Sequence, residues 1–266
     1  MATPRKLDPG AYLPGSLGTE LNLAAPIGPG SAKKQVKWVQ ERLYLAGFGL
    51  RIDGDFGPAT QQQLKNFQQA KGLQATSLYA QAEHDLLTLP FVDALNPIQA
   101  AGRTIGDLTV AVARQHVAQH PVEVGGPNSG PWVRMYMDGE EGPEWLWCAG
   151  FSFFMLQQAC YLLNQPLPMK RSVSVDTVVD RAKASGTFLT EKESKTADGR
   201  ARIDPGSFFL VRASSTHWSH MGIVSASGDA TFKTCEGNSN DDGSSNGYEA
   251  LERVRNYTGK DFVVWR

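Results

Sequence analysis

The sequence has few cysteines, and they form no recognisable pairs. Only three occur among the 266 residues, Cys148, Cys160 and Cys235, and no Cys-x-x-Cys motif is present. Cysteines so few and so scattered exclude a disulfide framework and argue against a structural zinc site. At least one of them is therefore free for chemistry.

An excess of charge of one sign and a long apolar run are also missing. Lys and Arg number 26 against 27 Asp and Glu, which gives a formal net charge of −1. This balance argues against a nucleic-acid partner and against an anionic membrane surface as partner. No apolar run approaches the roughly 20 residues that cross a bilayer, so we predict no membrane span.

The first twenty residues lack the apolar core of a Sec signal peptide, although Arg5 and Lys6 are basic. We therefore expect synthesis in the cytosol and no export by the Sec route. Residues 1–30 are rich in Gly, Pro and small side chains. This composition predicts a flexible or loosely docked N-terminal arm without regular structure.

Residues 31–90 have the periodicity of a small three-helix bundle. The first helix carries Val36, Val39 and Leu43 at helical spacing. Pro58 stands where a second helix would begin, and a third helix is predicted over residues 77–89. A bundle of about 60 residues is close to the lower size limit for independent folding.

Two pieces of this segment, IDGDFGPAT and LKNFQ, resemble the signature of the peptidoglycan-binding domain of type 1. The resemblance covers residues 31–90 and implies a helical module that binds peptidoglycan. On the residues alone, each position also fits a structural role: Gly54 and Gly57 permit tight turns, and Phe56 fills the bundle.

We predict that residues 91–103 form a linker and that residues 104–266 form a second domain. Within that domain, EWLWCAGFSFFMLQQACYLL places Cys148 at the start of an apolar helical run. A cysteine in the first turn of a helix faces unpaired N–H groups and the positive end of the helix dipole, and both favour the thiolate. An inert buried thiol is the alternative for Cys148 and the preferred interpretation of Cys160.

A cysteine nucleophile needs a base, and His220 is the best placed of the five histidines. His217 remains an alternative, because it precedes the predicted strand and its direction cannot be inferred. His116 and His120 have a spacing that suits a metal, but no third ligand accompanies them. A solvated helix face explains that pair better.

The segments HMGIVSA and ATFKTCEG predict two strands joined by a three-residue turn centred on Gly228. This register places His220 opposite Glu236, with Cβ atoms about 5 Å apart. Glu236 would then accept the imidazole N–H and orient the ring. Asn238 would lie diagonally on the same face. A two-residue turn would instead send Glu236 to the other face.

Four stretches of the second domain together resemble the CHAP family of cysteine amidases and peptidases. They are VGGPNSGPWV, WCAGF, DPGSFFLV, and SHMGIV followed by CEGN. The resemblance runs from about residue 123 to residue 266. It departs mildly at Ser219 and Met221, where the family frequently has Gly and Val.

The resemblance implies a role for each matching residue. Cys148 would be the nucleophile, His220 the general base and acid, and Glu236 the orienting carboxylate. Asn238 would be a supporting polar group, and whether it or Glu236 orients the histidine stays open.

Three further residues, Trp147, Trp132 and Asn128, are candidates for binding substrate along the cleft. Core packing or loop scaffolding explains them equally well.

The loop 238–249 nearly fits the spacing of a calcium-binding loop. However, Asn238 replaces the usual first Asp, and no helix clearly precedes the loop. A polar surface loop is the better interpretation, so we predict no cofactor and no metal site.

Together these patterns predict an α+β chain, in which a three-helix bundle precedes a papain-like CHAP domain with the Cys148 helix packed on an antiparallel sheet. The predicted function is peptidoglycan hydrolysis by an endolysin-like, monomeric N-acetylmuramoyl-L-alanine amidase or endopeptidase acting through a cysteine thioester. It would reach the cell wall by holin-type release or dedicated secretion. Which amide bond is cut stays open.

Two other classes of function remain. One is a non-catalytic wall-binding or virion structural protein with a degenerate CHAP fold. The other is a CHAP-like amidase for a soluble small molecule, against which the N-terminal bundle argues.

Overall fold

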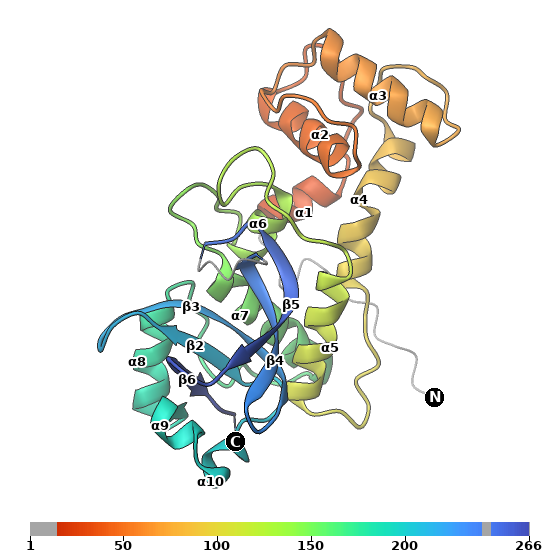
Figure 1. Cartoon of the computed structure of the whole chain (residues 1–266). Helices are drawn as coiled ribbons and strands as arrows, with labels where there is room; N and C mark the ends of the chain where they lie inside the picture. Colours follow the sequence, from red (N-terminus) through yellow and green to blue (C-terminus); the bar gives the residue numbers. More distant parts are fainter. Residues whose placement is uncertain (1–14, 241–245, 266) are drawn as a thin grey trace. The chain divides into compact units, whose positions relative to one another are not determined.

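The computed structural model describes residues 15–240 and 246–265. Within these residues the chain forms ten helices and one six-stranded antiparallel sheet (Figure 1), so the predicted α+β class is confirmed. The helices are α1 (Gly15–Leu21), α2 (Lys33–Leu45), α3 (Pro58–Ala70), α4 (Gln81–Leu95), α5 (Ile105–Val117), α6 (Pro131–Tyr136), α7 (Cys148–Leu163), α8 (Val175–Ser185), α9 (Glu191–Ser194) and α10 (Ala197–Arg200). The strands are β1 (Phe188–Leu189), β2 (Phe208–Arg212), β3 (Trp218–Ser227), β4 (Thr231–Ser239), β5 (Glu249–Asn256) and β6 (Lys260–Val263). Among the described helices, none is long and apolar enough to cross a membrane.

The described residues divide into two compact units that alternate along the chain. Unit 2 contains residues 15–93 and Glu123–Pro143, and unit 1 contains Ala94–Val122 and the described residues from Glu144 onward. This division differs from the predicted boundaries in two respects. Residues 91–95 complete α4 where a linker was expected, and Glu123–Pro143 group with the bundle instead of the second domain.

In unit 2, the apolar residues of the periodic segment form one core. Its members are Ile27, Val36, Val39, Leu43, Phe56, Leu64, Phe67, Tyr79 and Leu87. Pro58 opens α3 as predicted, because its missing N–H needs no partner at the first helical position. The third helix, α4, begins at Gln81 and not near residue 77, because Tyr79 forms an extended bridge with Ile27.

That bridge also corrects the prediction that residues 1–30 lack regular structure. Ile27 and Tyr79 exchange two backbone hydrogen bonds of 2.8 and 2.9 Å, and residues 15–21 form α1. Arg42 fastens the end of α1 through a 2.9 Å hydrogen bond from Nη2 to the carbonyl oxygen of Glu20. Residues 1–14 of the predicted arm lie outside the described residues.

The buried side chain of Gln40 holds the DGDFG loop between α2 and α3. Its Oε1 accepts the backbone N–H groups of Asp53 and Gly54 at 3.0 and 2.7 Å, and its Nε2 donates to Thr60 at 3.0 Å. Gly54 has a φ of +76°, and a Cβ there would lie 2.3 Å from the side chain of Lys33. The loop therefore requires glycine at this position.

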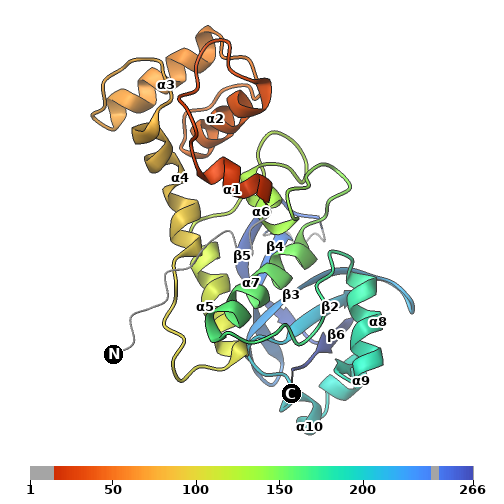
Figure 2. The same cartoon turned by 180° about the vertical axis from the view of Figure 1, so that it is seen from behind.

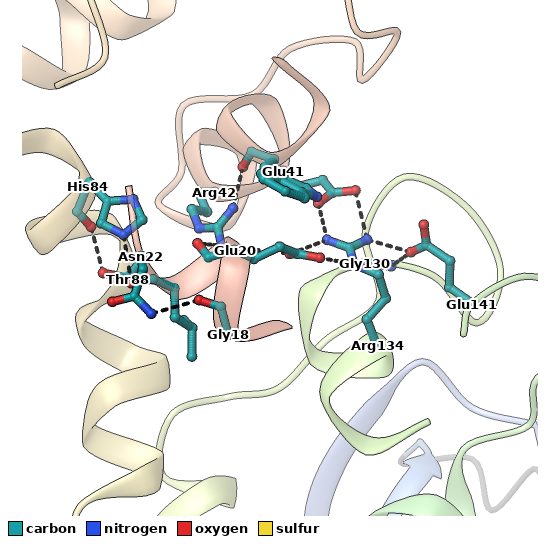
Figure 3. Close-up of polar contacts among 12 residues, drawn as sticks. Gly18, Glu20, Asn22, Glu41, Arg42, His84, Thr88, Gly130, Arg134 and Glu141 are labelled. Atoms are coloured by element: carbon teal, nitrogen blue, oxygen red, sulfur yellow. Dashed lines mark hydrogen bonds and ion pairs between the residues drawn. The ribbon is translucent and has the colours of Figure 1, made fainter. Parts of the chain in front are cut away.

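One buried arginine joins the segment Glu123–Pro143 to the rest of unit 2 (Figure 3). Arg134, on α6, donates to Glu20 through Nε and Nη2, each at 2.8 Å, and to Glu41 through Nη2 at 2.7 Å. Its Nη1 also donates to the partly exposed Glu141 at 2.6 Å. The side chains of Arg134, Glu20 and Glu41 are at most 6% exposed. Charges so deeply buried are tolerated only when they are paired.

In unit 1, the sheet has the strand order β1-β6-β2-β3-β4-β5. Helix α7 packs against β3 and β4 and lies beside α5 (Figure 2). Strands β3 and β4 correspond to the two strands predicted from HMGIVSA and ATFKTCEG. The edge strands β1 and β5 were not predicted. The segment of β5, with alternating charged residues, has the pattern of a partly solvated strand.

The β3–β4 hairpin brings His220 and Glu236 onto one face, but not in the predicted register. Ile223 pairs with Cys235, so Glu236 stands opposite Gly222, two residues away from the predicted position opposite His220. A Cβ on Gly222 would lie 3.0 Å from Cγ of Glu236. The missing side chain thus leaves room for the carboxylate to reach diagonally to His220.

Two irregularities produce this slip. The turn is longer than predicted, because Ser227 pairs with Phe232, and the ladder shifts at a bulge between Val224 and Ala226. Because side chains alternate between faces, a net slip of two residues leaves each of them on the predicted face. The predicted register is wrong, yet the predicted contact forms.

Candidate active site

Cys148 is the first residue of α7, as predicted, and it is buried. Burial acts to raise the pKa of its thiol. The neighbouring His220 and the backbone N–H groups of Met221 and Ala149 outweigh burial, so the pKa is lowered from the usual value. A lower pKa increases the fraction of nucleophilic thiolate near neutral pH.

The pKa values of the other two cysteines are raised instead of lowered. Burial raises the pKa of Cys160 to about 11, and burial together with the charge of Glu252 raises that of Cys235 to about 12. Cys148 alone among the three combines a lowered pKa with a histidine partner.

His220 is held between the thiol and a carboxylate. Its Nε2 lies 2.9 Å from Oε2 of Glu236, and both side chains are at most 1% exposed. Burial acts to lower the pKa of His220, but Cys148 and Glu236 outweigh it and raise the pKa to about 9. Because Nε2 is engaged by Glu236, Nδ1 is the nitrogen left to exchange a proton with Cys148. Nδ1 is buried and has no hydrogen-bond partner among the described residues, so it is free for this exchange.

Glu236 is itself fixed by several donors. Arg255, on β5, donates through Nε to Oε1 and through Nη2 to Oε2, each at 2.5 Å. The hydroxyls of Thr234 and Ser239 donate at 2.6 and 3.2 Å. Burial acts to raise the pKa of Glu236, but Arg255 and His220 outweigh it and hold the pKa well below the usual range. Sequence analysis missed Arg255, because β5 was not predicted and nothing in the sequence pairs its residues with β4.

Asn238 is buried and makes no side-chain hydrogen bond with His220. It has a φ of +53°, and neither polar atom of its side chain has a hydrogen-bond partner within the described part of the chain. The ladder between β4 and β5 is irregular between Glu236 and Ser239, so the backbone departs from regular strand geometry at this residue. Of the two candidates for orienting His220, the geometry therefore favours Glu236.

Trp147, Trp132 and Asn128, the candidates for binding substrate, are buried. Their exposed fractions are 0, 2 and 1%. Trp132 packs on Phe91 with ring centroids 4.2 Å apart, and Asn128 donates to the carbonyl of Pro143 at 3.1 Å. Packing and loop closure, the alternatives weighed for these residues, account for them.

His217 and His116 have partners of their own. Nδ1 of His217, the alternative base, lies 2.8 Å from Oδ2 of Asp176 in an exposed pair. His116 is buried against Gln158 at 3.1 Å, and burial lowers its pKa to about 4. The predicted solvated helix face is therefore wrong for His116, which is buried.

No cluster of three or more potential metal ligands occurs among the described residues. Residues 241–245 of the candidate calcium loop lie outside those residues.

A cavity of about 590 Å³ in unit 1 lies at the other end of α7. It is lined by Arg103, Asp107, Leu163, Gln165, Asp204 and Trp265, among others. It contains no cysteine or histidine, so it is not the candidate active site.

Comparison with known families identifies part of unit 2. Residues 32–77 match the family described as "Putative peptidoglycan binding domain". This segment is therefore a peptidoglycan-binding domain of type 1, which indicates peptidoglycan as a partner and association with the cell wall. The match does not extend to the region of Cys148. No curated protein and no solved structure matches the chain.

Proposed function

We propose that the chain is a peptidoglycan hydrolase that cleaves an amide bond through Cys148. One observation carries this proposal: His220 is held between the Cys148 thiol and the buried carboxylate of Glu236. Cysteine hydrolases use a thiol nucleophile, a neighbouring histidine as base, and an acidic residue that orients the histidine. The CHAP resemblance supports an N-acetylmuramoyl-L-alanine amidase or an endopeptidase, and the peptidoglycan-binding domain identifies the polymer.

In the first half of the reaction, the Cys148 thiolate attacks the carbonyl carbon of the amide. Backbone N–H groups at the start of α7, including that of Ala149, stabilise the developing oxyanion. His220 gives its proton to the departing nitrogen, the C–N bond breaks, and a thioester on Cys148 remains. Glu236 keeps the ring in place throughout.

In the second half, neutral His220 takes a proton from water as the water oxygen attacks the thioester carbon. The C–S bond breaks and the product leaves with a new carboxyl group. Cys148 and His220 return to the thiolate–imidazolium pair. The reaction consumes one water and needs no cofactor.

The peptidoglycan-binding domain helps this reaction by keeping the enzyme bound to the cell wall. A linked binding module raises the effective concentration of the catalytic unit at an insoluble substrate. We place the action of the protein, as a monomer, at the cell wall, after holin-type release or dedicated secretion.

The test is lysis of permeabilised Gram-negative cells and of purified Gram-positive walls by wild type, Cys148→Ala and Cys160→Ala. Cys160→Ala is the matched control, because it removes a second buried thiol from the same helix. We expect loss of turbidity with wild type and Cys160→Ala and none with Cys148→Ala.

Mass spectrometry of the released fragments identifies the cleaved bond from the new termini. Equal lysis by wild type and Cys148→Ala would remove Cys148 from the mechanism. Sedimentation of all three proteins with walls, without lysis by any, would establish the non-catalytic wall-binding alternative in its place.

A further inference from the structure

Glu236 is a fully buried carboxylate. Its side chain is 0% exposed, and it must be ionised to hold the positive charge of His220. An isolated carboxylate in such surroundings takes up a proton instead, because burial disfavours the charged form. Something beside it must therefore stabilise the anion.

Arg255 makes the strongest contacts of this kind. Its guanidinium places Nε on one oxygen and Nη2 on the other, the two-pronged geometry that suits a carboxylate. The guanidinium also lies over the ring of Phe209, 5.2 Å from the centroid, and the side chain is only 13% exposed. Its position is thus set independently of Glu236.

The other groups around Glu236 are weaker or more distant. On β4, Thr234 and Ser239 are neutral donors. Arg253, on β5, donates to the hydroxyl of Ser239 at 3.3 Å and to the carbonyl oxygen of Asn240 at 2.5 Å. On β6, Lys260 interacts with Glu236 only through its charge.

The other titratable groups near Glu236 include His220 and Cys148, the proposed base and nucleophile. His220 on β3 contacts the carboxylate, and Cys148 on α7 lies beyond that histidine. Cys235, on β4, has a raised pKa, caused mainly by burial, and contributes no charge near neutral pH. Among the described residues, Arg255 is therefore the one cation that forms an ion pair with Glu236, apart from His220.

We propose that Arg255 is a positioning residue, which keeps Glu236 ionised and aligned on His220 and so sets the acid limit of Cys148 reactivity. The role rests on the proposed function but concerns a step before any substrate binds. Without Arg255, the pKa of Glu236 would rise, and the carboxyl would become protonated in mild acid. His220 would then lose its acceptor, and Cys148 would hold its proton more tightly.

The experiment measures the alkylation rate of each cysteine in the full chain between pH 4.5 and 9, with iodoacetamide as probe and peptide mass spectrometry as readout. The proteins are wild type, Arg255→Met and Arg255→Lys. Arg114→Met is the matched control, because Arg114 forms an exposed ion pair with Glu252. Cys160, whose pKa is raised by burial alone, is the internal reference in every sample.

We expect Cys148 of wild type and of Arg114→Met to stay reactive to the acid end of this range. In Arg255→Met the fall of the alkylation rate at low pH (the acid limb of the profile) should begin at a higher pH. At pH 5 the rate should drop about tenfold for each unit by which the pKa of the Cys148 thiol increases. The loss should be smaller at pH 8, where Glu236 is ionised in either protein. Arg255→Lys keeps the charge without the two-pronged contact, so we expect a smaller shift of the acid limb.

Parallel profiles for wild type and Arg255→Met would overturn the proposal, and so would an equal loss at all pH values. If Arg255→Met does not fold, as judged by circular dichroism, the profile of Arg255→Lys decides. Failure of wild type to lyse walls, together with a shifted acid limb in Arg255→Met, would refute the proposed function and leave the role of Arg255 standing.

Discussion

Replacing Arg134 with methionine should destabilise unit 2 by about 3–5 kcal/mol, the usual cost of removing one partner from a buried ion pair. Methionine preserves much of the side-chain volume, so the loss is mainly electrostatic. Glu20 would keep a second cation, because Nη2 of Arg42 lies 3.7 Å from its Oε2. Glu41 would keep none, since Arg134 is its only partner in the described structure. The penalty therefore falls mainly on Glu41.

The assay is urea unfolding followed by hydrogen exchange and mass spectrometry, which reports on peptides of each unit separately. Peptides of α2 and α6 should lose protection at lower urea in Arg134→Met, whereas peptides of unit 1 should not change. Adding Glu41→Gln to Arg134→Met should recover most of the loss, because Glu20 keeps Arg42 and Glu41 no longer carries an unpaired charge.

Acid should also recover part of the stability. Burial already raises the pKa of Glu41 in the wild type despite the contact with Arg134. Without that contact the pKa rises further, so the folded state takes up a proton as pH falls and its stability increases relative to neutral pH. A loss below about 1 kcal/mol, as for an exposed ion pair, would refute this reasoning. So would a double variant, Arg134→Met with Glu41→Gln, that is no more stable than Arg134→Met.

Two further predictions concern unit 1. Gly222→Ala places a methyl group 2.6 Å from the Phe209 ring; it should cost about 1–3 kcal/mol by overpacking, measured by urea unfolding, and should slow alkylation of Cys148 at pH 7. Unchanged stability and alkylation would show that the ring moves aside. In an NMR titration, the His220 imidazole should have an apparent pKa near 9, and Cys148→Ser should lower it towards the ordinary value of about 6.5 by removing the thiolate. A His220 pKa that does not move in Cys148→Ser would contradict the pairing.

Local signals along the sequence predicted those parts of the fold that depend on nearby residues. Pro58 marks the start of α3, and Cys148 marks the start of α7, because helix starts follow from a few consecutive residues. The contact between His220 and Glu236 was predicted for a related reason. Alternation along a strand fixes the face of each residue, even where the register of pairing is wrong.

The contacts that the sequence did not predict join distant segments. Arg255 reaches Glu236 from a strand whose pairing partner no local pattern identifies. Arg134 meets Glu20 across 114 positions of the chain. The burial of Trp132 was also not predicted, because aromatic residues suit a core and a binding cleft equally well.

The alternation of the two units along the chain has a consequence for synthesis and for protein engineering. Glu41 leaves the ribosome 93 residues before the arginine that neutralises it. The bundle is therefore translated early, but Arg134, which neutralises Glu41, is translated only after α5 of the other unit. A segment cut at residue 90 and fused to another enzyme would leave the buried carboxylate of Glu41 without Arg134, whereas Glu20 would keep Arg42. A transplantable wall-binding segment from this protein must include residues 123–143 or replace Glu41 with a neutral residue.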